Sequence, residues 1–301
     1  MACRILSVGH ILTDMRVRVN EFIESDLFST INELSYGAGG SAANVAIGVT
    51  RLGGLCTLVG KIGLDNFGRM IVDELVKEKV GLEYVKTDLV SRTGLTIVII
   101  NGRGEITMYG YKGASETLEP NDVSYIKPEG CEYVHIASLR MDTSLAAAEL
   151  SKKNDLLVTF DPGRELASMG IDHIRPIFPY LDLILLNMKE ARLLTGYDEP
   201  VMACSALLKA GIKGVIVKLG ERGIHFCGEM GEGTLPAFKV KAVDTTGAGD
   251  AFATGLLLSL GKGSFKDAVR YAGAVAALKV AQLGSHAIST QKEVEELLST
   301  Q

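Results

Sequence analysis

The sequence predicts an α/β protein, with a mostly parallel sheet covered by helices on both faces and a small β-sheet that forms a lid. Two patterns indicate this fold. Strand-like apolar runs alternate with helix-like stretches along most of the chain, and two β-rich segments interrupt that alternation. The chain has 301 residues, of which 47% are hydrophobic, so it can bury a substantial core.

The strand-like runs are short and rich in Val, Ile and Leu, which is typical of strands buried on both faces. They lie at residues 4–9, 55–60, 132–137, 156–160, 182–186 and 213–219. Apolar residues at helical spacing predict helices at 41–52, 66–79, 143–152, 188–195 and 199–210, and the C-terminal part also reads as mainly helical. This alternating order is the signature of crossover connections, so we expect a mostly parallel sheet.

The β-rich segments at about 16–36 and 84–112 carry the lid prediction. Within the second, the runs 96–100 and 105–111 flank Asn101-Gly102-Arg103-Gly104, a turn sequence that favours a hairpin. Strands that leave a parallel sheet and return to it would form a small projecting sheet, well placed to cover a ligand. No Pro- or Ser-rich linker is evident, so we treat residues 1–301 as a single domain with this lid.

Charge and cysteine content argue against several classes of protein. The net charge is −5, from 36 acidic and 31 basic residues, and without a long Lys/Arg run we expect no nucleic-acid partner. No apolar stretch reaches the ~18 residues that a membrane span needs, and no signal-peptide core is evident. No C-x-x-C pair occurs, which argues against a zinc site or a disulfide framework; the five cysteines are Cys3, Cys56, Cys131, Cys204 and Cys227. We expect a soluble cytoplasmic protein.

The most informative segment is Asp244-Thr245-Thr246-Gly247-Ala248-Gly249-Asp250, which leads into an apolar helical run. Small residues at a helix start expose backbone N–H groups that can bind an anion such as a phosphate in transfer. A carboxylate at Asp250 would repel a phosphate that is merely bound, but it suits a base that removes a proton from an attacking hydroxyl. The alternative, a Gly-rich turn with Asp250 as a helix cap, is about equally common for this segment taken alone.

A second Gly-rich segment, Gly37 to Asn44, also leads into a helix. Its small residues allow a ligand close to the backbone, and the amide of Asn44 suits a hydroxyl-rich molecule. Asp14 could bind hydroxyls or be a solvated loop carboxylate. Further polar residues and glycines follow strands, at the edge where open α/β sheets bind ligands, although each alone is more often a turn or a cap: Asp161, Arg164, Asn187, Glu190, Gly220 and Gly223.

Two other nucleotide-binding motifs do not match the sequence. The segment nearest to a Walker A loop, Gly255 to Gly263, has the wrong spacing and carries Gly where Ser or Thr must hold magnesium. Neither Gly-rich segment has the spacing or the strand–helix context of a dinucleotide fingerprint.

Together these residues resemble the ribokinase family of carbohydrate and nucleoside kinases, also called the phosphofructokinase B family. Gly39-Gly40 through Asn44, with Gly53-Gly54, resembles the first family signature, and Asp244 to Asp250 resembles the second. Asn187-Met188-Lys189-Glu190 resembles the family's N-x-x-E motif. The similarity covers nearly the whole chain.

The resemblance implies an α/β fold with a β lid and transfer of the terminal phosphate of ATP to a substrate hydroxyl. It implies Mg²⁺ as cofactor and, in several members, a monovalent cation such as K⁺ behind the anion hole. Lids in this family often form dimer contacts, which suggests a homodimer. The implied roles are a base at Asp250; an anion hole at Gly247, Ala248 and Gly249; magnesium and phosphate binding through water at Asn187 and Glu190; nucleotide contacts at Lys218, Gly220 and Gly223; substrate contacts at Asp14, Gly39, Gly40 and Asn44; and the monovalent cation at Asp244, Thr246 and Gly284.

The acceptor is left open, because the chain departs from ribokinases proper. It carries Ser41 where they have Lys, and Ser138 with Arg140 nearby where they have Glu. The segment Phe160 to Arg164 partly resembles the D-P-N-x-R region of 2-keto-3-deoxygluconate kinases, whose Arg binds a sugar-acid carboxylate, and some archaeal-type nucleoside kinases look similar there. A neutral sugar, a sugar acid or sugar phosphate bound through Arg164, and a nucleoside all stay open.

Two hypotheses come from other classes. A non-catalytic sugar or nucleotide sensor would keep the pocket but have a damaged anion hole or no Asp250, and the sequence has neither defect. The other is a NAD-dependent oxidoreductase, but the sequence lacks the dinucleotide-binding fingerprint of that class. The five histidines are scattered, and we assign none of them a catalytic role.

Overall fold

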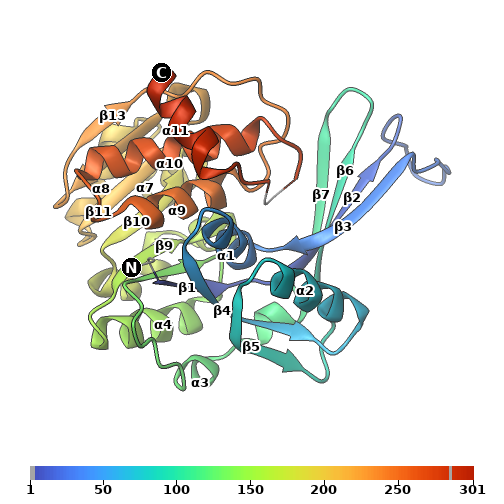
Figure 1. Cartoon of the computed structure of the whole chain (residues 1–301), viewed down its shortest axis with the longest axis horizontal. Coiled ribbons are helices and arrows are strands. Elements are labelled where there is room, and N and C mark those ends of the chain that lie inside the picture. Colours follow the sequence, from blue (N-terminus) through green and yellow to red (C-terminus); the bar gives the residue numbers. More distant parts are fainter. Residues whose placement is uncertain (1–3, 285–286) are drawn as a thin grey trace.

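The computed structural model describes residues 4–284 and 287–301, so Cys3 lies outside the described residues (Figure 1). Its strands are β1 (Arg4–Gly9), β2 (Leu12–Arg18), β3 (Glu33–Gly39), β4 (Leu55–Gly63), β5 (Gly81–Asp88), β6 (Gly94–Ile100), β7 (Ile106–Tyr111), β8 (Tyr133–Ala137), β9 (Leu157–Asp161), β10 (Leu183–Asn187), β11 (Gly214–Lys218), β12 (Ile224–Gly228) and β13 (Gly233–Leu235). Its helices are α1 (Ser41–Arg51), α2 (Asn66–Lys77), α3 (Pro120–Val123), α4 (Met141–Lys153), α5 (Gly163–Ser168), α6 (Ile171–Ile174), α7 (Met188–Thr195), α8 (Pro200–Lys209), α9 (Ala248–Ser259), α10 (Phe265–Val280) and α11 (Gln291–Thr300).

The main sheet has nine strands in the order β13-β12-β11-β10-β9-β8-β1-β4-β5. From β11 to β5, neighbouring strands in this order pair in parallel. Only the edge strands β12 and β13 pair antiparallel. The alternation of runs in the sequence therefore predicted the parallel part correctly. The antiparallel edge was not predicted, because β13 is only three residues long and its apolar pattern is weak.

Helices cover both faces of this sheet, and each face has its own core. One core contains buried residues of α1, α2, α9, α10 and α11, among them Val45, Ile71, Phe252 and Val275. The other contains buried residues of α3 to α8, among them Ala147 and Leu207. The helices α1 and α9 are buried along most of their length, which explains the continuous apolar residues in both segments.

The lid is a separate four-stranded sheet with the order β3-β2-β6-β7 (Figure 1). Strands β6 and β7 form the hairpin predicted from the turn at residues 101–104, with Gly104 N donating to Asn101 O. Two details differ from the sequence-based bounds. Residues 84–88 belong to β5 of the main sheet, because β5 pairs in parallel with β4, and β2 begins at Leu12 rather than near residue 16.

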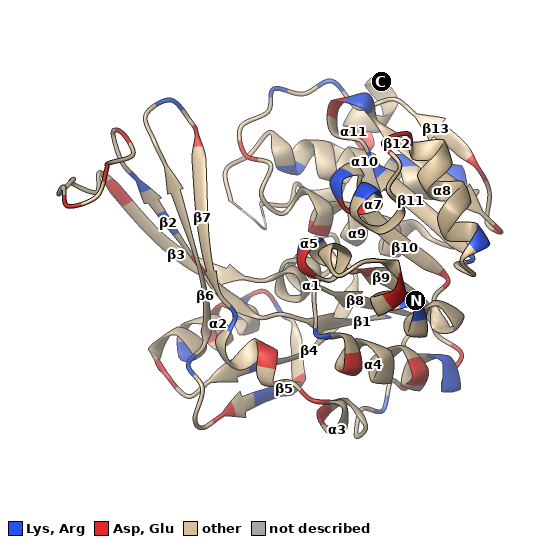
Figure 2. Cartoon of the chain, turned by 180° about the vertical axis from the view of Figure 1, so that it is seen from behind, with Lys and Arg blue, Asp and Glu red and all other residues tan. Residues whose placement is uncertain are grey.

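Strand register gives the lid two chemically different faces. Met15 lies opposite Tyr36 and Ile97, and Ile97 lies opposite Tyr109, so one face is apolar. Asp14 and Arg16 point to the other face, because side chains alternate along a strand. In Figures 1 and 2 the lid stands away from the main sheet, and its strands reach the main body beside α1.

In the part of the chain that the structure describes, no helix is long and apolar enough to cross a membrane. The four described cysteines are free.

Candidate active site

The start of α9 is built around Gly247. This residue is the helix cap and has φ 75°, a left-handed conformation that favours glycine, so the chain can turn sharply into the helix. The first N–H groups of a helix have no intrahelical acceptor; of these, Ala248 N–H donates to Thr245 O at 3.2 Å. Asp250 lies in this first turn of the helix.

Asn44 and Asp250 bring the two Gly-rich segments together. Asn44 Nδ2 donates a hydrogen bond of 2.8 Å to Asp250 Oδ2, across 206 residues of sequence. Asn44 Oδ1 is buried, and among the described residues it has no hydrogen-bond partner. An acceptor atom left open in a buried site is suited to a hydroxyl group of a ligand.

Asp14 lies at the base of the lid and is buried. A Cβ atom at Gly39 would lie 2.3 Å from the Asp14 carboxylate, so only glycine lets these strands approach so closely. Gly40 follows as the cap of α1. The structure thus gathers Asp14, Gly39, Gly40 and Asn44, the residues expected to contact the substrate, around the base of the lid.

Arg16 belongs to this region and was missed by the sequence analysis. Its side chain is 17% exposed, and Nη2 lies 3.8 Å from Asp14 Oδ2. Nε and Nη2 are buried and have no hydrogen-bond partner among the described residues. The period-2 pattern Asp14, Arg16, Arg18 could have indicated a polar inner face of the lid.

Lys218 is the counter-ion of a group of carboxylates at the ends of β9, β10 and β11. Its Nζ lies 3.0 Å from Asp161 Oδ2, and it also interacts with Glu190 and Asp250. Burial raises the pKa of Asp250 to about 7, and the Asp161 charge adds to this while Asn44 and Lys218 oppose it. Burial also raises the pKa of Glu190 to about 7, again helped by Asp161.

Asn187 and Glu190 fix the start of α7. Asn187 Oδ1 accepts from Glu190 N at 3.0 Å, and Glu190 Oε2 accepts from Asn187 N at 2.8 Å. In the described residues, no group of three or more His, Cys, Asp or Glu could hold a metal ion by itself. The arrangement fits Mg²⁺ held through phosphates and water, because a buried carboxylate with a raised pKa gains from a cation beside it.

Gly220 and Gly223 flank the short turn that follows β11, directly after Lys218. Gly223 N–H donates to Gly220 O, and Leu219 N–H donates to Gly223 O at 2.8 Å. The turn therefore lies beside the carboxylate group, at the edge of the sheet where the N-terminus of α9 also lies.

Arg164 lines a cavity of about 730 Å³ at the ends of β8 and β9. Its side chain is exposed. Two other cations that line the cavity are paired: Lys112 with Glu116 and Glu165, and Arg140 with Asp142.

Asp244, Thr246 and Gly284 are also close together. Asp244 Oδ1 accepts from Thr246 N at 2.9 Å, and Oδ2 accepts from Gly284 N at 3.0 Å. The side chain of Lys279, which the sequence analysis did not single out, lies against the same aspartate. The signal for Lys279 was available, since it falls on the buried face of α10 with Ala268, Ala272 and Val275.

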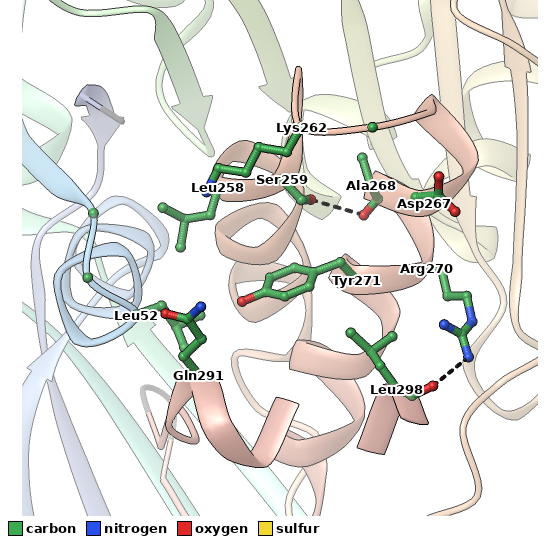
Figure 3. Close-up of a pocket in the computed structure, with 13 residues that line it drawn as sticks. Leu52, Leu258, Ser259, Lys262, Asp267, Ala268, Arg270, Tyr271, Gln291 and Leu298 are labelled. Carbon is green, nitrogen blue, oxygen red and sulfur yellow. Dashed lines mark hydrogen bonds between the residues drawn. The ribbon is translucent and has the colours of Figure 1, made fainter. Parts of the chain in front are cut away.

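Another cavity, of about 540 Å³, lies between the end of α1, the α9–α10 connection and α11 (Figure 3). None of the predicted site residues is among those that line it. Gly53 and Gly54, part of the first signature, do line it, so this part of the motif lies at the end of α1 opposite to Asn44.

Comparisons with known proteins point to one family. A model of the pfkB family of carbohydrate kinases matches residues 3–292. The chain is 30% identical over 306 residues to an ATP-dependent ribose-1-phosphate kinase from Halopiger xanaduensis, covering 98% of each chain. It is 31% identical over 286 residues to fructokinase-2 from Solanum lycopersicum, covering 86% of each.

Solved structures agree with these relatives. The fold is similar to that of a ribokinase from Thermotoga maritima, with a TM-score of 0.87, 27% identity and complete coverage of both chains. It is also similar to that of an E. coli protein solved in complex with ATP and Mg²⁺, with a TM-score of 0.83, 23% identity and complete coverage.

Lys218→Met should destabilise the protein, and more so at alkaline pH. At pH 8 the carboxyl groups whose pKa values are raised would be ionised without their buried counter-ion. We expect this to lower the free energy of unfolding by about 3 kcal/mol. At pH 5 Asp250 and Glu190 are protonated, since their pKa values are near 7, so the loss should be less than half as large. Urea unfolding at both pH values measures this, with Lys209→Met on exposed α8 as control. An equal loss at both pH values would contradict the assignment.

Proposed function

The chain belongs to the pfkB family of carbohydrate kinases and has their ribokinase-like fold, and we propose the reaction that it catalyses. It transfers the terminal phosphate of ATP to a hydroxyl group of a sugar. The contact between Asn44 and Asp250 carries this proposal, because it joins polar groups that suit hydroxyls to a carboxylate at a helix N-terminus. The named relatives, an ATP-dependent sugar-phosphate kinase and a fructokinase, support the same donor and acceptor chemistry.

In the proposed mechanism Asp14 and Asn44 hold hydroxyl groups of the sugar, and Asp250 removes the proton from the one that attacks. A pKa near 7 suits a base that works at neutral pH. The first N–H groups of α9, from Gly247 to Gly249, receive the charge that develops on the transferred phosphate.

The nucleotide lies along Lys218, Gly220 and Gly223 in this proposal. Asn187 and Glu190 orient the water shell of Mg²⁺, which supplies charge neutralisation on the phosphates when bound. The lid excludes water that would otherwise hydrolyse ATP.

Asp250→Asn should lower kcat by about 10²–10⁴, because an amide cannot accept the proton of the attacking hydroxyl. Mass spectrometry should detect phosphorylated product from the wild type, with ATP and Mg²⁺, for at least one acceptor in a panel of neutral sugars, sugar acids, sugar phosphates and nucleosides. ADP replaces ATP in a parallel series.

Nucleotide binding serves as one control for Asp250→Asn and should resemble the wild type, as should unfolding at pH 5, where Asp250 is protonated. A variant with a near-normal rate would disprove the role of Asp250 as the base. No product with any acceptor or either donor would favour the sensor hypothesis.

A second candidate, a sugar that carries an anionic group, is favoured by Arg16. Its buried guanidinium has open donors beside Asp14, on the lid face that points to the acceptor. Guanidinium groups bind carboxylates and phosphates through paired hydrogen bonds. The relative that phosphorylates ribose 1-phosphate acts on such a sugar. Arg164 is the alternative anion contact, on the rim of the cavity at β9.

Arg16→Ala should raise KM for an anionic acceptor by about 10- to 100-fold, the cost of losing a hydrogen bond to a charged group. KM for a neutral sugar should stay the same. Steady-state kinetics with both acceptors measure this, with exposed Arg18→Ala on the same strand as control. A raised KM with Arg164→Ala alone would assign the anion to the cavity at β9, and a raised KM for ATP would assign Arg16 to the donor.

The lid supports a homodimer as well. Its apolar face carries exposed Leu34, Tyr36 and Tyr109 next to half-buried Met15 and Ile97. This exposed surface is therefore made of residue types that are usually buried. A second copy packed on this face would remove those side chains from water.

Light scattering should therefore give a mass twice 32.1 kDa for the wild type. Leu34→Glu combined with Tyr109→Glu should yield a monomer, because two charges on each copy would be buried without partners. Tyr125→Glu, on an exposed residue outside the lid, is the control and should stay dimeric. A monomeric wild type would refute the lid dimer.

A further inference from the structure

Lys279, in the last turn of α10, carries a fully buried positive charge. Its side chain is 0% exposed, although lysine is almost never fully buried unless paired. Nζ donates a hydrogen bond of 2.6 Å to the backbone oxygen of Asp244 and lies 3.8 Å from Asp244 Oδ2. Burial lowers the pKa of this ammonium, and Arg16 adds to that, whereas the charges of Asp244 and Asp250 oppose it.

Asp244 is the centre of a junction between three segments. Its backbone N–H donates to Val280 O at the end of α10, and its carboxylate accepts from Thr246 N and Gly284 N. Asp244 begins the turn that leads to Gly247 and α9. The junction therefore fixes the turn that precedes the anion hole.

The oxygens of this junction do not fit a further cation. The sequence analysis expected a monovalent cation at Asp244, Thr246 and Gly284, but the backbone oxygen and both carboxylate oxygens of Asp244 each already accept a hydrogen bond from a described donor. A metal ion bound there would also stand next to a buried ammonium, and two like charges at such a distance repel strongly in a medium of low dielectric constant.

We infer that Lys279 is the built-in cation of the anion hole, and that this kinase needs no monovalent metal ion at that position. The inference rests on the proposed role of the N-terminus of α9. A fixed ammonium behind the turn adds positive potential to the first N–H groups of the helix, where charge develops during transfer. Lys279 touches no reactant, so it is a positioning residue.

The first experiment uses the wild type. Its initial rate and melting temperature are compared in potassium chloride and in tetramethylammonium chloride at the same ionic strength. We expect rates that agree within about twofold and equal melting temperatures, because the described residues of the junction leave no vacant site that would couple K⁺ to folding or catalysis. Activation by K⁺ of about tenfold or more, or a melting temperature that rises with K⁺ in the usual saturating way, would overturn the inference.

The second experiment removes the ammonium. Lys279→Ala should lose at least about tenfold in kcat in tetramethylammonium, and K⁺ should restore part of that rate and raise the melting temperature, because the vacated oxygens can bind it. Lys266→Ala, an exposed residue on the same helix, is the control and should respond to neither salt. A Lys279→Ala variant with the wild-type rate in tetramethylammonium would overturn the inference.

The two experiments separate this inference from the proposed function. The melting temperature of the wild type needs no acceptor, so it tests the cation even if no product is ever detected. If Lys279→Ala does not fold, the wild-type comparison decides alone. If product forms but depends on K⁺, the proposed function stands and the role of Lys279 fails.

Discussion

The packing of α1 against α9 determines where the chemistry of this protein lies. Both helices are buried in one core, and Thr254 of α9 reaches the α1 backbone with a hydrogen bond to Val45 O. The packing sets the two N-termini at one edge of the main sheet, so Asn44 meets Asp250 although 206 residues separate them. Any displacement of either helix would separate Asn44 from the proposed base, which explains why both segments consist of small and apolar residues.

This arrangement places acidic groups close together, which lowers the stability of the folded protein. Asp161, Glu190 and Asp250 surround Lys218, and two of the three carboxyl groups have pKa values raised to about 7 by burial. Their mutual repulsion would be relieved by Mg²⁺ and by donors to the ionised form, so the site is electrostatically suited to a cation and a phosphate together. The stability that the protein loses by burying these carboxylates is thus linked to ligand binding.

The lid exposes apolar side chains on the face that points away from the site. Asp14 and Arg16 point toward the site, on the same face as buried Val98, while Met15 and Tyr109 lie on the opposite face. An ordinary surface sheet is polar on the face turned away from the protein. The apolar outer face therefore fits the proposed dimer, in which a second copy would cover it.

The amino-acid sequence alone was sufficient to predict the features that depend on neighbours along the chain. The alternation of strands and helices, the hairpin at residues 101–104 and the Gly-rich start of α9 could all be predicted, because side-chain period, turn residues and helix caps are local properties. It also indicated which polar residues follow strands at one sheet edge, including Asp161, Asn187 and Glu190.

Which charged groups come together depends on the tertiary fold. The helical spacing of Lys279 with the apolar residues of α10 indicates that it lies on the buried face, but only the docking of α10 on the segment before α9 sets it against Asp244, 35 residues away. The position of Arg16 on the inner face of the lid likewise depends on the pairing of β2 with β3 and β6. Contacts of this kind depend on how distant elements pack, and the free energy of a buried charge depends on every group around it, so no local pattern encodes them.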